Sequence, residues 1–172
     1  MTNSATAGAP AGAPAGRREG VTIERTYQAS IEDVWEMWTT KDGIEAWWGP
    51  EGFAVAVRAI DLRAGGALDY TMRATDAGQI DFMKKANMPV AIDHRLTYTE
   101  VAPPKRLAFS HYADFIPGVE PYQVNHTVEL HATADGVRVT VTIDRMHDDY
   151  WTEMAVKGWT SELEKLAKAL AA

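Results

Sequence analysis

The chain has 172 residues, of which 46% are hydrophobic, and a formal net charge of −7 at pH 7. This length suits one domain with a large core, and an acidic balance without a basic run disfavours nucleic acid as a partner. With no Cys, the sequence excludes disulfides, thiolate metal ligands and thiol nucleophiles, and it suits a cytoplasmic protein.

The N-terminal segment differs in composition from the rest of the chain. Residues 2–16 are nearly all Ala, Gly, Pro, Ser and Thr, without the apolar block of a signal peptide. We expect a disordered tail over residues 1–19 and one folded domain over residues 20–172. No segment reaches the roughly 20 apolar residues that a membrane span needs, so we expect a soluble protein.

Alternating apolar and polar residues predict a first strand over residues 21–29. Ser30 can cap a helix whose apolar residues recur at spacings of three and four. A second, shorter helix is predicted over about residues 43–48, because Gly49-Pro50 would end it. The apolar residues of the first helix, which we assign to core packing, are Ile31, Val34, Trp35 and Trp38.

About six further strands follow, because alternating apolar residues are separated by turn signals such as Gly65-Gly66 and Asp135-Gly136. Residues 79–90 fit no period, and their Phe and Met side chains predict a loop that covers something apolar. The predicted strands span residues 53–61, 68–72, 92–101, 107–111, 124–130 and 137–143.

A long helix is predicted at the C-terminal end. Apolar residues recur there every three or four positions from Trp151 to Leu170, most charged residues including Glu162 lie off that stripe, and Asp148 or Asp149 can cap the start. The order of elements predicts an α+β fold, in which a curved antiparallel sheet of about six or seven strands wraps around this helix. Such curvature leaves space for a small molecule between helix and sheet.

Four motifs resemble the START-like helix-grip superfamily in their order and spacing: Trp47-Trp48-Gly49-Pro50, the Asp-Leu-Arg-Ala-Gly-Gly run 61–66, the Val-Ala-Pro-Pro-Lys-Arg-Leu run 101–107, and Gly158-Trp159. The resemblance covers residues 21–170. The most similar branch is that of bacterial homologues of the C-terminal domain of the heat-shock protein 90 ATPase activator. The resemblance implies a helix-grip fold with an internal cavity.

The superfamily is known for lipid and hormone carriers, polyketide cyclases and aromatases, and stress-related ligand binders. Eukaryotic activators carry a separate N-terminal domain, whereas only an Ala/Gly/Pro-rich segment precedes the fold here, which disfavours a co-chaperone role. Asp93-His94-Arg95 also departs from the common pattern, and the resemblance implies no role for these residues.

Predicted strand faces and helix positions select a set of side chains for the cavity. We expect them to surround an apolar or aromatic ligand, with His111 or His126 making its hydrogen bonds or moving a proton. The alternative for each histidine is a buried ring that hydrogen-bonds to the backbone. The candidate ligand-binding residues are Trp48, Tyr70, Met72, Phe109, His111, His126, Trp151 and Trp159.

The sequence shows no cofactor motif and no metal motif. It lacks HExxH, a phosphate-binding loop, a dinucleotide fingerprint and a GxSxG elbow, so we expect no cofactor and no metal. His147-Asp148-Asp149 clusters metal-type donors, although helix capping explains the aspartates equally well. Asp61 and Arg63 are expected to form a structural ion pair beside the Gly-Gly turn.

Three functions remain open. The first is non-enzymatic binding of a small apolar or aromatic molecule. The second is a cofactor-free cyclase or aromatase with His126 or His111 as its acid–base group, for which Glu100, Asp114 and Asp144 are carboxylate alternatives. The third is a regulatory module that contacts a chaperone. An edge strand in an open sheet is also compatible with a homodimer.

Overall fold

The structure is a computed structural model and describes residues 19–172. The predicted disordered tail therefore falls, apart from Glu19, outside the described residues. No helix within residues 19–172 has the length and apolar character needed to cross a membrane. The elements are β1 (Gly20–Tyr27), α1 (Ile31–Thr39), α2 (Lys41–Trp47), β2 (Phe53–Ile60), β3 (Ala67–Ala74), α3 (Ala77–Lys85), β4 (Ala91–Ala102), β5 (Arg106–Ala113), β6 (Tyr122–Ala132), β7 (Val137–Asp144) and α4 (Asp149–Ala171).

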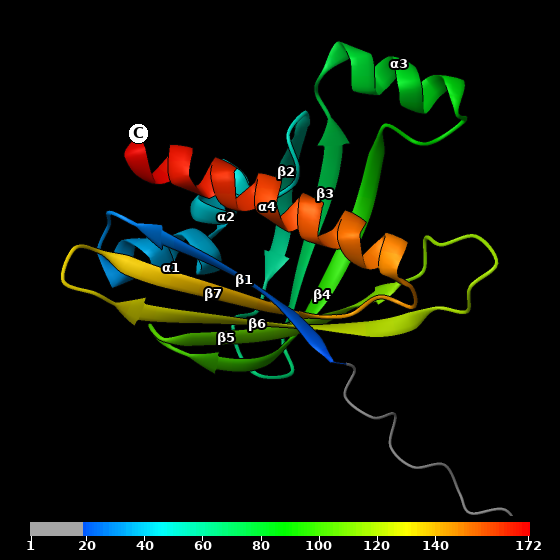
Figure 1. The fold of residues 1–172 in the computed structure, drawn as a ribbon. Helices are drawn as coiled ribbons and strands as arrows, with labels where there is room; N and C mark the ends of the chain where they lie inside the picture. The colour runs from blue at the N-terminus through cyan, green and yellow to red at the C-terminus, as the bar shows by residue number, and fades with distance from the viewer. Residues whose placement is uncertain (1–18) are drawn as a thin grey trace, which may run out of the picture.

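The strands form one antiparallel sheet in the order β1-β7-β6-β5-β4-β3-β2. Strands β2 to β7 lie side by side in the order of the sequence, and β1 pairs with β7 at one edge of the sheet. The sheet is strongly curved, and α4 crosses its concave side while α1 and α2 cover one end (Figure 1). This arrangement confirms the predicted α+β helix-grip fold.

The first two helices begin where the sequence places a cap. The Ser30 side chain accepts a hydrogen bond from the Asp33 amide at 3.1 Å, and Thr40 does the same for Gly43 at the start of α2. Such caps satisfy amides that the helix itself leaves unpaired. Trp38 on α1 is buried, so α1 turns its apolar stripe to the core as predicted.

Residues 79–90 contain a helix, so the prediction of a loop there is wrong. Asp76 caps α3 by accepting a hydrogen bond from the Gln79 amide at 3.0 Å. Local capping, rather than an apolar stripe, starts this helix, and Met83 is its one buried side chain. Phe82 is 63% exposed and Met88 45% exposed, so these side chains do not cover an apolar surface of their own chain.

The sheet opens between β4 and β5. Pairing of β4 with β5 begins at Thr97 opposite Ser110, whereas β4 already pairs with β3 from Ala91 onwards. The first half of β4 therefore has a sheet neighbour on one side only among the described residues, and it carries α3 away from β5 and β6 (Figure 1). We call this opening the fork.

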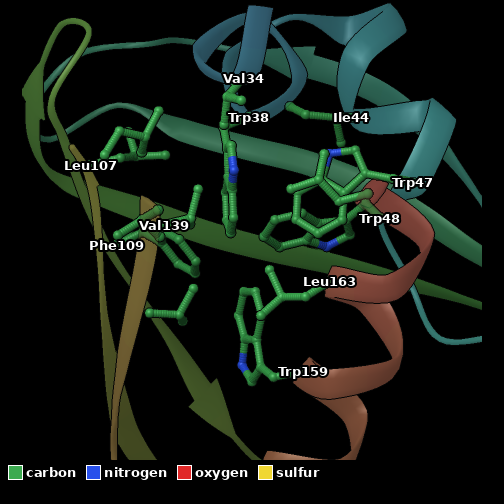
Figure 2. Packing of buried hydrophobic residues seen from close by; sticks show 14 of the residues in the cluster. Val34, Trp38, Ile44, Trp47, Trp48, Leu107, Phe109, Val139, Trp159 and Leu163 are labelled. Atoms are coloured by element: carbon green, nitrogen blue, oxygen red, sulfur yellow. The ribbon is translucent and has the colours of Figure 1, made fainter. Parts of the chain in front are cut away.

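Helix α4 is tied to the rest of the fold in its second half. Trp159 and Leu163 are buried against the sheet and the first helices (Figure 2). Leu166 is buried in the same cluster. The Tyr27 hydroxyl donates to the Leu163 carbonyl at 3.0 Å, and the Lys165 ammonium donates to the Gly49 carbonyl at 2.9 Å. These hydrogen bonds hold α4 against the end of β1 and against the turn that follows α2.

Candidate functional site

Aromatic and imidazole rings from three strands, from the end of α2 and from α4 meet on the concave side of the sheet. The Trp48 ring centroid lies 5.6 Å from that of Trp159 and 6.0 Å from that of Phe109 (Figure 2). Tyr70 lies 6.4 Å from Trp48, and His126 lies 4.8 Å from Phe109. The structure thus brings together six of the eight candidate ligand-binding residues, which we call the ring cluster: Trp48, Tyr70, Phe109, His111, His126 and Trp159.

His126 is the most enclosed polar group of the ring cluster. It is 4% exposed, it stacks on Phe109 with an interplanar angle of 9°, and its Nδ1 atom has no hydrogen-bond partner among the described residues. Burial lowers the pKa of His126 to about 3, the nearby His111 adds to the shift, and the Val124 backbone opposes it. The ring is therefore neutral at neutral pH.

His94 and His111 lie at the fork, on β4 and β5. The His94 ring stacks on Tyr70 with centroids 5.2 Å apart, and the His111 ring lies 4.9 Å from His126. Burial lowers the pKa of both histidines, whereas the Asp114 carboxylate opposes the shift. Each ring is partly exposed and mainly neutral at pH 7, so each offers one hydrogen-bond donor and one acceptor.

Glu162 on α4 is a polar group that the sequence prediction missed, because it assigned this residue to the outside of the stripe. Burial raises the pKa of Glu162 to about 7, while the Lys165 ammonium and the Gly49 amide oppose that shift. The negative charge of Glu162 also contributes to raising the pKa of Tyr70. The signal in the sequence was the three-residue spacing from Trp159, which places Glu162 one turn further along the same side of the helix.

The other two candidates lie apart from the centre of the ring cluster. Met72 is partly buried and reaches the turn after Trp48, since a Cβ atom at Gly49 would lie 3.5 Å from the Met72 Cε atom. Trp151 belongs to a second apolar cluster near the start of α4, where its ring lies 5.7 Å from that of Phe115. Trp151 therefore lies at the end of the molecule where the fork opens.

The cluster around His147 fixes the start of α4. The Asp148 carboxylate caps the helix by accepting from the Trp151 amide at 2.8 Å, and its second oxygen lies 3.2 Å from His147 Nε2. The Tyr122 hydroxyl lies 3.1 Å from His147 Nδ1. Capping therefore accounts for Asp148, and residues 19–172 contain no group of three or more His, Asp or Glu side chains placed to hold a metal ion.

Two open hollows stand out on the described surface, and neither lies inside the ring cluster. One, of about 630 Å³, is bounded by Gly52, Asp76 and Lys165 beside the start of α3. The other, of about 820 Å³, lies between α1, α2 and the end of α4. The interior around Trp48 is occupied by ring side chains, which include Trp38 and Trp47 at centroid distances of 5.7 and 5.1 Å.

Solved structures of similar fold come from several bacteria. A protein from Chromobacterium violaceum is 22% identical over 89% of this chain and 97% of its own, with a TM-score of 0.72. An AHSA1 protein from Silicibacter pomeroyi is 20% identical over 89% and 98% of the two chains, with a TM-score of 0.68. An AHSA1-like protein from Aeromonas hydrophila is 22% identical over 89% and 92%, with a TM-score of 0.67.

At these identities the likeness concerns the fold. No curated protein matches the chain. The family model described as Activator of Hsp90 ATPase homolog 1-like protein matches residues 28–171. This span runs from the residue after β1 to the end of α4 and includes the ring cluster, the fork and Glu162. The chain belongs to this family of proteins that resemble the activator of Hsp90 ATPase.

Proposed function

We propose that the protein binds a small apolar or aromatic molecule at the fork, between the first half of α4 and the sheet, without changing it chemically. The observation that supports this proposal is the pair of partly exposed imidazoles, His94 and His111, at the opening in the sheet. Membership of this family supports the proposal as far as a ligand-binding or activator-type module.

The chemistry of the fork favours a ligand with one or two hydrogen-bonding groups on an apolar body. The two neutral imidazoles can donate to a carbonyl or accept from a hydroxyl. Ile92 and Met154, which are 36% and 43% exposed, supply apolar surface on β4 and α4. Because the ring cluster fills the inner end, the ligand would extend outward from His111 towards Trp151 rather than inward towards Trp38.

A second candidate function is acid–base catalysis, and Glu162 is the observation that favours it. A carboxyl group whose pKa is raised to about 7 can both donate and accept a proton near neutral pH, which is the property of a general acid or base. Tyr70, whose pKa is raised by burial to about 12, would stay protonated beside it as a hydrogen-bond donor. Turnover of a bound ketone or phenol precursor would distinguish this function from simple binding.

The test begins with native mass spectrometry of the purified protein and continues with tryptophan-fluorescence titrations of phenols, aryl ketones and medium-chain acyl alcohols. We expect saturable binding to wild type and at least tenfold weaker binding to His111→Leu. His131→Leu is the matched control, because His131 is exposed on the same sheet and should leave affinity unchanged. Absence of any saturable ligand, or equal affinity in both variants, would contradict the proposal.

Mass spectrometry of the recovered compounds separates the two candidate functions. An unchanged compound supports binding alone. A new product that forms with wild type, and at least a hundredfold more slowly with Glu162→Gln, would replace binding with acid–base catalysis as the function.

A further inference from the structure

The large apolar side chains that remain exposed are concentrated at one end of the molecule. Among residues 19–172 they are Phe82, Met88, Ile92, Tyr112, Phe115, Tyr150 and Met154. They lie on α3 and the start of β4, at the end of β5 and in the loop after it, and at the start of α4, which all occupy the right-hand side of Figure 1. Exposed apolar surface gathered in this way marks an interaction site in soluble proteins.

Two rims border this end, and they carry opposite charges. The α3 rim consists of Phe82 and Met88 with Lys84 and Lys85, which form the basic last turn of α3. The exposed Asp81 lies one turn before Lys85, so the two lysines leave this rim with a net positive charge. The α4 rim carries its charge on the loop after β5 and on the second turn of α4. The residues that define the α4 rim are Phe115, Tyr150 and Met154 with Asp114, Glu120 and Glu153.

The charges of both rims form no salt bridge among the described residues, although the Asp114 carboxylate acts on His94 and His111. Salt bridges within residues 19–172 involve neither of the two lysines of the α3 rim nor any of the three carboxylates of the α4 rim. Elsewhere on the surface, exposed charges do form pairs, as Arg58 does with Asp93 at 3.6 Å. A partner that brings acidic groups to Lys84 and Lys85, and basic groups to Glu153, would form ion pairs with the charged side chains of both rims.

A second copy of this chain has that composition. We propose that two copies form a two-fold symmetric dimer in which the α3 rim of each packs against the α4 rim of the other. Because a two-fold interface pairs every patch with its complement twice, both basic turns meet acidic rims and both apolar groups are covered. The same contact closes the fork of each protomer from outside.

The size of the exposed surface is adequate for such a dimer. The six apolar side chains apart from Tyr112, which belongs to the convex side of β5, are roughly half exposed. At about 200 Å² for a large side chain, they present on the order of 600 Å² of apolar surface. A standard stable interface buries about 800 Å² per partner, and the charged residues of the rims supply the remainder.

Charge reversal tests the proposed pairing directly. The first variant, Lys84→Glu with Lys85→Glu, makes both rims acidic, and the second, Glu120→Lys with Glu153→Lys, makes both rims basic. We expect wild type to dimerise in sedimentation velocity between 1 and about 100 μM, and each variant alone to show at least a tenfold higher dimer Kd. An equimolar mixture of the two variants should dimerise like wild type, because each rim then meets the opposite charge.

The control for the first variant is Lys105→Glu with Lys168→Glu, which makes the same change of net charge at the other end of the molecule and should leave the dimer intact. A wild-type protein that stays monomeric at 100 μM would overturn the proposal. It would also be overturned if both variants dimerised as well as wild type, or if mixing them restored nothing. The dimer would cover Ile92 and Met154, which the proposed function also assigns to the ligand. The measurement contains no ligand, so its outcome tests the dimer alone.

Discussion

The neutral, enclosed ring of His126 predicts a specific sensitivity of the fold to acid. Burial lowers the pKa of His126 from 6.5 to about 3, so between these values the unfolded chain takes up a proton that the folded chain does not. Stability contributed by the neutral ring is therefore fully present above pH 6.5 and is lost as the pH falls towards 3. Replacement by phenylalanine removes the titrating group and keeps a flat ring against Phe109.

The magnitude follows from the two pKa values. At pH 5.0, which is about 1.5 units below the pKa of the unfolded residue, the wild type should have lost about 2 kcal/mol relative to pH 7.5 on account of this one histidine. His126→Phe should lack that part of the loss. The variant removes the unpaired Nδ1 atom but also the hydrogen bond between the ring and the Val124 backbone, so it should lie within about 1.5 kcal/mol of wild type at pH 7.5.

The assay is urea unfolding followed by tryptophan fluorescence at pH 7.5 and 5.0, for wild type, His126→Phe and His131→Gln. The exposed His131 serves as the control and should leave the pH dependence unchanged. Contributions from Glu162 and from His94, His111 and His147 are common to all three proteins, so they cancel in the comparison. If wild type and His126→Phe lose the same free energy of unfolding between the two pH values, the reasoning about the enclosed ring is wrong.

Two further predictions concern stability. As the pH rises from 5.5 to 8.5, Glu162→Gln should gain about 1–2 kcal/mol in free energy of unfolding relative to wild type. The reason is that the pKa of Glu162, raised from 4.5 to about 7, makes ionisation of the folded wild type costly as the pH rises. Urea unfolding at the two pH values measures this difference, and a difference that does not change with pH would contradict the prediction. Gly66→Ala should lower the free energy of unfolding by about 2–3 kcal/mol, because its Cβ atom would lie 2.0 Å from the Asp61 carbonyl oxygen. Gly158→Ala, where nothing lies within 4 Å, is the matched control and should be neutral or stabilising in thermal unfolding.

Features set by neighbouring residues could be predicted from the sequence. The alternation in each strand, the cap at Ser30 and the Asp135-Gly136 hairpin all depend on contacts within a few positions, and the structure confirms them. The ion pair of Asp61 with Arg63 is also present, at 2.9 Å. Together these local patterns determine the order of the elements and hence the fold.

Features set by long-range geometry could not be predicted. The fork depends on where the pairing of β4 with β5 begins, which alternation alone does not specify. Trp151 shares the apolar stripe of α4 with Trp159, yet it packs with Phe115 because the sheet diverges there. Glu162 was missed because the turn at Gly49 packs over this edge of α4 and buries the carboxyl group, and the spacing of residues within the helix does not show that contact. Helix α3 was missed because its cap and its single buried Met83 give no periodic signal.

The pairing of β1 with β7 has a consequence for synthesis of the chain. Thr22 lies beside Thr142, 120 positions later, so the first strand leaves the ribosome long before the strand that it needs. At 5 to 20 residues per second the wait is on the order of 10 s. During that interval Trp38, whose ring stacks on Trp159 of α4 with centroids 6.0 Å apart, lacks this covering ring. The nascent chain therefore passes through a period in which the apolar face of α1 is accessible to chaperones, and folding can finish only after the last helix has emerged.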